Sequence, residues 1–210
     1  MIVSPGRGYV FVHIPKTAGT AMSLALEARA KADDILIGDT PKAVRRRGRL
    51  KGAQVAGRLW KHSKLSDIAG LLPAGVLSTL RPVTLVRNPW DRMVSYYHWL
   101  RVQTFDHPAA VAAKSHDLRG FLSDVDVATG LRRNPYASYV AGGAEPIFIR
   151  LEALEQDLAP FEALLGFSLS LPVTNVSDRI MDWRSYYDAE TRDMVADLCA
   201  QDIAQFGYAY

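Results

Sequence analysis

A lysine, two threonines and a glycine lie close together near the start of the chain, in the segment PKTAGT that ends at Thr20. Lys16 supplies a positive charge, and Thr17, Gly19 and Thr20 supply hydroxyl and backbone N–H donors. A short loop of this kind that leads into a helix points several N–H groups and the helix N-terminus at one spot, where phosphate or sulfate binds. Residues 16–20, with Ala18 in the turn, are therefore a candidate oxyanion site.

The residues on either side of this loop predict a strand and a helix. The run Tyr9–Ile14 is almost continuously apolar and is rich in β-branched and aromatic residues, as in a strand buried on both faces of a parallel sheet. Pro15 ends the strand because it has no N–H to donate. After Thr20, apolar residues recur with helical spacing at Ala21, Leu24, Ala25 and Ala28.

A second stretch, PVTLVRNPWDRMVSYYHWL, has the same organisation. Val83–Val86 predicts a strand with Arg87 at its carboxyl end. Asn88 can cap the following helix, Pro89 suits its first position and Asp91 favours its N-terminus. The helix should bury the apolar residues that follow with helical spacing, namely Trp90, Met93, Val94, Tyr97 and Leu100.

Both stretches resemble the cofactor motifs of one enzyme family. HIPKTAGT resembles the 5′-phosphosulfate loop of sulfotransferases that use 3′-phosphoadenosine 5′-phosphosulfate (PAPS), and RNPWDRMVSYY resembles their 3′-phosphate motif. The resemblance implies an α/β, three-layer P-loop-type fold with a central, mostly parallel sheet flanked by helices, as a single domain over residues 1–210. It implies PAPS as donor, 3′-phosphoadenosine 5′-phosphate (PAP) as product, and no metal. The donor would be bound by Lys16, Thr17, Ala18, Gly19, Thr20, Arg87 and Ser95, with Asn175 and Ser177 near the nucleotide.

Because ligands of open α/β sheets bind beyond the carboxyl ends of the strands, we expect Arg87 and the Lys16 loop to converge. The ATP-binding version of such a loop reads G-x-x-x-x-G-K-[ST], with the lysine late. Here Lys16 comes three residues before Gly19. A P-loop kinase using ATP and Mg²⁺ is therefore the weaker alternative, and Asp39 is interpreted as a loop residue rather than an Mg²⁺ ligand. A non-catalytic binder of phosphoadenosine nucleotides or polyanions is the other alternative.

Sulfuryl transfer needs charge stabilisation on the departing phosphate and a base for the acceptor. Lys16 suits the first role. His62, in WKHSKL, resembles the catalytic histidine of heparan-type O-sulfotransferases, and an imidazole suits a general base. If His62 is not the base, a carboxylate such as Asp39 or Glu152 is the alternative. His13, directly before the loop, is predicted to be structural.

The composition indicates the class of protein and the cellular compartment to expect. The 210 residues are 49% hydrophobic and 22% charged, with no apolar run near the ~20 residues that span a bilayer. The N-terminus lacks the order of a signal peptide, and the single Cys199 excludes an internal disulfide, so we expect a cytoplasmic protein without a membrane span. Cys199 is predicted to be an inert core residue.

The net charge of +3 conceals a local concentration of positive charge. Between residues 42 and 64 there are nine basic residues and no acidic one: Lys42, Arg45, Arg46, Arg47, Arg49, Lys51, Arg58, Lys61 and Lys64. Such a field favours an anionic partner. An anionic carbohydrate acceptor is the leading prediction, a small alcohol or phenol is the alternative, and no nucleic acid is expected.

The remaining elements follow from shorter patterns. Ile35–Ile37 and Ile147–Ile149 predict strands, and 153–165 predicts a helix. Ser66 is predicted to cap a short helix that Pro73 ends, with another short helix over 74–80. Short helices are expected over 118–122 and 135–140, and a last helix over about 190–205.

Overall fold

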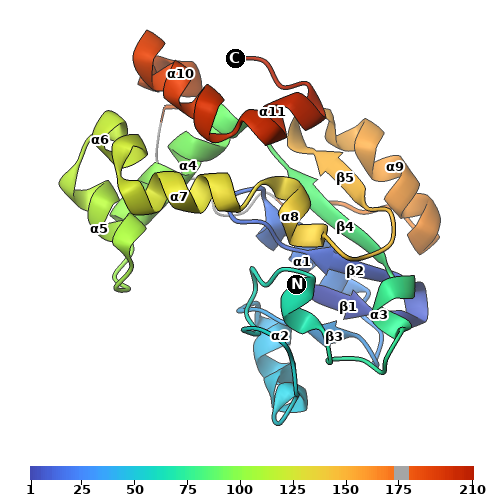
Figure 1. Ribbon diagram of the computed structural model, residues 1–210. Coiled ribbons are helices and arrows are strands. Elements are labelled where there is room, and N and C mark those ends of the chain that lie inside the picture. The colour runs from blue at the N-terminus through green and yellow to red at the C-terminus, as the bar shows by residue number, and fades with distance from the viewer. Residues whose placement is uncertain (173–179) are drawn as a thin grey trace. The chain divides into compact units, whose positions relative to one another are not determined.

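A computed structural model describes residues 1–172 and 180–210, and it shows an α/β protein built on a five-stranded sheet (Figure 1). The strand order is β3-β1-β2-β4-β5. Strands β2 and β4, and β4 and β5, pair in parallel, whereas β1 pairs antiparallel with both β2 and β3. The strands are β1 (Ile2–Ser4), β2 (Tyr9–Val12), β3 (Ile35–Leu36), β4 (Arg81–Val86) and β5 (Ile147–Arg150). The predicted α/β fold with a sheet flanked by helices is confirmed; its parallel part is β2-β4-β5.

The parallel strands end at the same edge of the sheet. Every residue of β2 is buried, as its apolar run predicts. Val12 pairs with Thr84, and Val86 pairs with Arg150. The Thr84 hydroxyl also donates a hydrogen bond of 2.8 Å to the carbonyl oxygen of Val12, which ties the end of β2 to β4. The loop after β2 therefore begins at the edge where β4 and β5 end.

The chain forms two compact units. The first consists of Met1–Val86 and the segment that begins at Ser138, and it contains all five strands of the sheet. Helices α1 and α9 pack on the face of the sheet that carries Tyr9 and Phe11, and Figure 1 shows α9 beside β5. Phe161 of α9 meets Tyr9 edge to face, with ring centroids 5.2 Å apart. The helices of this unit are α1 (Gly19–Ala28), α2 (Pro41–Arg46), α3 (Val76–Thr79) and α9 (Leu154–Leu165). Helix α8 (Tyr136–Val140) begins in the segment of the second unit and ends in that of the first. Short 3₁₀ turns occur at Pro5–Arg7, Arg47–Leu50, Ser66–Ile68 and Leu151–Ala153.

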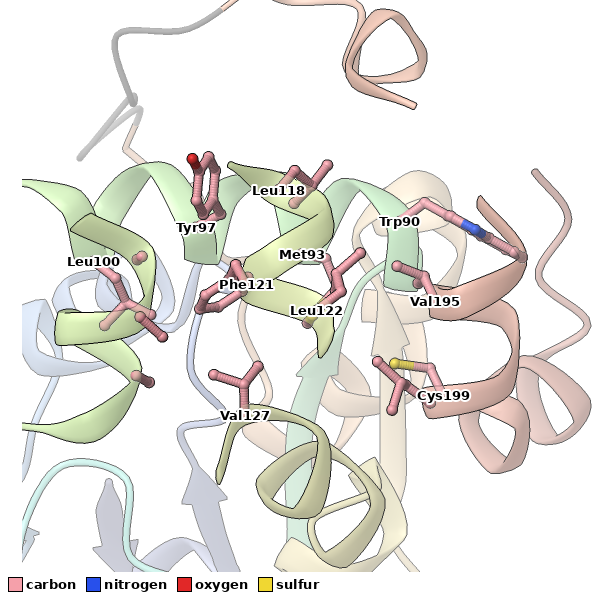
Figure 2. Close-up of a cluster of buried hydrophobic side chains, with 14 of the residues drawn as sticks. Trp90, Met93, Tyr97, Leu100, Leu118, Phe121, Leu122, Val127, Val195 and Cys199 are labelled. Carbon is pink, nitrogen blue, oxygen red and sulfur yellow. The ribbon is translucent and has the colours of Figure 1, made fainter. Parts of the chain in front are cut away.

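The second unit is helical and consists of Arg87–Ala137 with the C-terminal part of the chain. Its helices are α4 (Pro89–Arg101), α5 (Pro108–Ser115), α6 (Leu118–Ser123), α7 (Val125–Arg133), α10 (Ala189–Leu198) and α11 (Ala200–Phe206), with a 3₁₀ turn at Trp183–Tyr186. Figure 2 shows its core, in which the predicted face of α4 meets Phe121 of α6 and Val195 of α10. Cys199 is buried in this core, and burial raises the pKa of its thiol to about 12, as expected for an inert residue. The prediction of a single domain over residues 1–210 stays a prediction.

Two local predictions are wrong. Ser66 does not cap a helix: it lies inside a 3₁₀ turn, and the Asp67 carboxylate accepts the N–H of Lys64 instead. The final helix is broken at Cys199, whose φ of −114° is not helical. Helix α5 was not predicted; His107 caps it by accepting the N–H of Ala109 at its Nδ1. In the parts of the chain that the structure describes, no helix is both long and apolar enough to cross a membrane.

Candidate functional site

The loop between β2 and α1 has a strained backbone. Lys16 has φ of 68° and Ala18 has φ of 60°, and they are the non-glycine residues with positive φ among those the structure describes. The left-handed conformation costs about 1–2 kcal/mol for a residue with a side chain, and such strain concentrates at binding sites. Backbone N–H groups in turns of this kind form the concave sites that hold anions. The predicted strand–loop–helix arrangement is therefore present, with α1 beginning at Gly19.

The threonines of this loop are not equivalent. The Thr17 side chain is fully buried, and its hydroxyl donates to the carbonyl oxygen of Ile14 over 2.9 Å. Its only hydroxyl hydrogen is thus used within the loop, so Thr17 can donate to an anion only through its backbone N–H. Thr20 lies in the first turn of α1 and is half-buried.

The ring of His13 leaves no room for a Cβ atom at position 19, which explains the glycine there. A Cβ atom at Gly19 would lie 2.0 Å from Cδ2 and 2.4 Å from Nε2 of His13. His13 follows β2 directly and is only 6% exposed. Burial, together with His62 and nearby positive charges, holds the pKa of His13 well below its usual value. His13 is thus a buried, neutral residue that packs beneath the loop, which agrees with its predicted structural role.

His62 lies against His13 within the same unit. Nδ1 of His62 is 2.8 Å from the carbonyl oxygen of His13, and the two ring centroids are 4.5 Å apart. A carbonyl oxygen can only accept, so Nδ1 carries the hydrogen and Nε2 keeps its lone pair. Burial lowers the pKa of His62 to about 4; the bond to His13 opposes this shift and the charge of Lys61 adds to it. At neutral pH His62 is therefore an uncharged imidazole whose Nε2 lone pair can accept a proton.

The segment 58–64, which we call the His62 turn, is held by its own side chains and backbone. The Ser63 hydroxyl accepts the N–H of Trp60 over 2.9 Å and lies within donating distance of the Arg58 and Trp60 carbonyl oxygens, at 2.6 and 2.9 Å. The base of the turn is closed by backbone bonds from Ala56 to Ala69 and from Gly57 to Asp67. These bonds fix the position of His62 without any ligand.

The two alternative bases, Asp39 and Glu152, have surroundings that differ from those of His62. Asp39 forms an ion pair of 2.6 Å with Lys61. Burial would raise the pKa of Asp39, but the hydrogen bond and charge of Lys61 outweigh it, so the pKa is lowered and the carboxylate is a weaker base. Glu152 lies exposed on the 3₁₀ turn after β5. Within the described residues, no group of three or more His, Cys, Asp and Glu side chains could hold a metal ion.

The second motif begins where β4 ends. The Asn88 side chain accepts the N–H of Trp90 and Pro89 begins α4, as predicted. The Arg87 guanidinium is held by Asp91, with Nε and Nη2 at 2.9 and 2.6 Å from one carboxylate oxygen. Ser95 lies on the buried side of α4 and is 4% exposed.

Arg87 and Ser95 belong to the helical unit, so their convergence with the Lys16 loop stays a prediction. Asn175 and Ser177 lie outside the described residues. The prediction that these two residues contact the nucleotide is unchanged.

Sequence reasoning missed one arginine at the carboxyl edge of the sheet. Arg150 ends β5, and its Nε and Nη2 bond to the Asp157 carboxylate at 2.7 and 3.0 Å. The sequence feature that could have identified Arg150 is its position directly after the predicted strand over 147–149, the same pattern that identified Arg87. It also missed the partners of His62 on the His62 turn, because they become neighbours only in three dimensions.

The fold is similar to that of a known sulfotransferase. No protein-family model matches the sequence, and no curated protein is significantly similar to it. The crystal structure of mouse sulfotransferase SULT7A1 complexed with PAP superposes with a TM-score of 0.50 at 15% identity, over 96% of this chain and 85% of that one. A retinol dehydratase in complex with retinol and PAP gives a TM-score of 0.45 at 17% identity, over 97% and 83%. The likeness to the mouse protein shows the fold.

Proposed function

We propose that this chain, which has the fold of a PAP-binding sulfotransferase, transfers a sulfuryl group from PAPS to a hydroxyl group of a carbohydrate acceptor. The observation that carries the proposal is the junction of β2 and α1. There a strained loop suited to an oxyanion is supported by His13, and His13 in turn holds a neutral His62. An oxyanion site and a base in one compact unit are the two parts that sulfuryl transfer requires.

On the donor side, Lys16 stabilises the negative charge that grows on the departing phosphate. The backbone N–H groups of Thr17, Ala18, Gly19 and Thr20 would bind the phosphosulfate oxygens at the N-terminus of α1. Arg87 and Ser95 would read the 3′-phosphate; the Asp91 carboxylate orients the guanidinium before the nucleotide arrives. Asn175 and Ser177 would contact the nucleotide.

On the acceptor side, Nε2 of His62 takes the proton of the attacking hydroxyl. A bond forms between the acceptor oxygen and sulfur, the bond from sulfur to the bridging phosphate oxygen breaks, and PAP leaves with that electron pair. A base with a pKa near 4 is weak at neutral pH, but a bound polyanion nearby favours the imidazolium and raises this pKa. No step in this sequence requires a metal.

The basic residues between 42 and 64 have different surroundings in the structure, and this difference bears on the kind of acceptor. Lys42, Arg46 and Arg49 donate to backbone carbonyl oxygens at the end of α1 and in the loop after it, where they stabilise the fold. Arg58, by contrast, is exposed on the His62 turn, which supports an anionic acceptor at this place.

We place the protein in the cytoplasm on the ground of its sequence alone, since nothing in its composition calls for an oxidising compartment.

The proposal is tested by nucleotide binding and by transfer of label. Calorimetry with PAP, AMP and ATP–Mg²⁺, in the presence of EDTA for the first two, should show tight binding of PAP alone. Incubation with ³⁵S-labelled PAPS and a panel of oligosaccharides, alcohols and phenols should then label a carbohydrate. Preference for ATP–Mg²⁺ would instead indicate a kinase, and PAP binding without transfer to any acceptor would indicate a binding protein.

A further inference from the structure

An arginine and a tryptophan stand beside the candidate base on the His62 turn. Trp60 is 40% exposed, and its ring meets that of His62 edge to face at a centroid distance of 5.0 Å. The Arg58 guanidinium carbon lies 5.0 Å from the centroid of the same indole. Among the described residues no carboxylate lies within ion-pair distance of Arg58.

The position of this indole is fixed by the fold. An exposed apolar side chain alone means little, because much of any protein surface is apolar. Here, however, the backbone N–H of Trp60 is bound by the buried Ser63 hydroxyl, and both ends of the turn are tied down by backbone bonds. A large aromatic ring is therefore held at the surface in one place, in contact with the base. Preorganised aromatic groups of this kind bind ligands at low entropic cost.

We propose that Arg58 and Trp60 form the acceptor subsite, and that the ring they bind is a pyranose carrying a carboxylate or sulfate group. This inference rests on the proposed function and names the chemistry of its acceptor. The apolar C–H face of a sugar ring packs on the indole, while its hydroxyl groups remain at its edge. The guanidinium binds the anionic substituent through paired, charge-assisted hydrogen bonds.

The geometry connects this subsite to the reaction. The Trp60 and His62 rings are in edge-to-face contact, with centroids 5.0 Å apart, so a pyranose that packs on the exposed part of the indole lies next to the imidazole. The other cations near His62 have different partners: Lys61 is paired with Asp39, and Lys64 lies over Tyr139. Arg58 is the cation of this turn that lies over Trp60 itself, so its charge stands beside a ring that packs on the exposed part of this indole.

The test uses the full chain without nucleotide, so that it does not depend on turnover. The probes are trigalacturonate and a tetrasaccharide of alternating glucuronate and N-acetylglucosamine, compared with neutral maltotriose and with 1-naphthol. Binding is measured by calorimetry or NMR titration for wild type, Trp60→Ala, Trp60→Phe and Arg58→Gln. Arg45→Gln removes an exposed arginine of α2 and is the matched control for a general effect of charge.

We expect a uronic-acid probe to bind wild type, and we expect Trp60→Ala to weaken it about tenfold or more while Trp60→Phe retains most of the affinity. Arg58→Gln should weaken the uronate probe about tenfold and leave the weak binding of maltotriose unchanged. Arg45→Gln should have little effect. PAP binding, measured separately, should be the same in wild type and in all variants. If wild type does not bind PAP at all, that result refutes the proposed function and not this subsite.

Four results would overturn the proposal. One is that neither uronate probe binds wild type in the millimolar range. Another is that Arg45→Gln weakens binding as much as Arg58→Gln, which would show a diffuse field. The third is that Trp60→Ala binds as wild type does, and the fourth is that 1-naphthol binds more tightly than the uronates.

Discussion

Replacing Gly19 with alanine should disturb the fold and the base together, because of one contact. The new Cβ atom would lie 2.0 Å from Cδ2 of His13, far inside van der Waals distance. His13 cannot simply turn away, since it is buried and its ring packs at 4.5 Å against His62. Overpacking of this kind costs about 1–3 kcal/mol. We expect Gly19→Ala to lower the free energy of unfolding by that amount and to displace His62.

Urea denaturation of a double-mutant cycle measures this contact. His13→Ala removes the ring that the new methyl group meets, so Gly19→Ala should cost much less in the His13→Ala background, with a coupling energy of about 1–3 kcal/mol. Gly48→Ala is the matched control, because a Cβ atom there meets no heavy atom within 4 Å. Its effect should stay within about 0.5 kcal/mol.

Two results would refute the reasoning. If Gly19→Ala is as mild as Gly48→Ala, the clash does not exist. If Gly19→Ala and His13→Ala are additive, the glycine is needed for something other than His13. An alanine that leaves stability unchanged but abolishes PAP binding would indicate a need for close approach of the phosphate.

The remaining predictions concern charge. Lys16→Ala should lower kcat by about 10²–10³-fold with a smaller change in PAP affinity, and single-turnover kinetics separate the two effects. Arg87→Ala should remove most of the preference for PAP over AMP, which calorimetry should show to be about 10²-fold or more in wild type. The depressed pKa of His62 means that the unfolded chain binds more protons between pH 6.5 and about 4, so stability should fall as pH falls through this window. His62 should contribute up to about 3 kcal/mol of that loss, and His62→Asn should remove this part of the slope in urea denaturation at a series of pH values.

Local patterns predicted the elements that carry the site. The buried strand β2 follows from its continuous apolar run, and the start of α4 follows from Asn88 and Pro89, whose effects act within one turn. The ion pair of Arg87 with Asp91 was also open to prediction from its spacing of four residues, but Asp91 was interpreted only as a charge at a helix N-terminus.

The supporting contacts of the site could not be predicted in this way. The reason for Gly19 is His13, which approaches it only when the loop has folded. The strand β1 has three residues, IVS, and its identity comes from pairing with both β2 and β3. The low pKa of His62 arises chiefly from burial, which no spacing rule contains; the charge of Lys61, its neighbour in the sequence, adds to the shift.

The most direct test of the central claim is the transfer of ³⁵S from labelled PAPS by His62→Asn, with PAP affinity measured on the same sample. If His62 is the base, PAP should bind as in wild type and transfer should fall by about 10²–10⁴-fold, the usual contribution of a positioned base. The acidic limb of the kcat/KM profile, which reports the free-enzyme base with its pKa near 4, should disappear as well. Near-normal transfer with the acidic limb intact would contradict the account and show that the base is elsewhere.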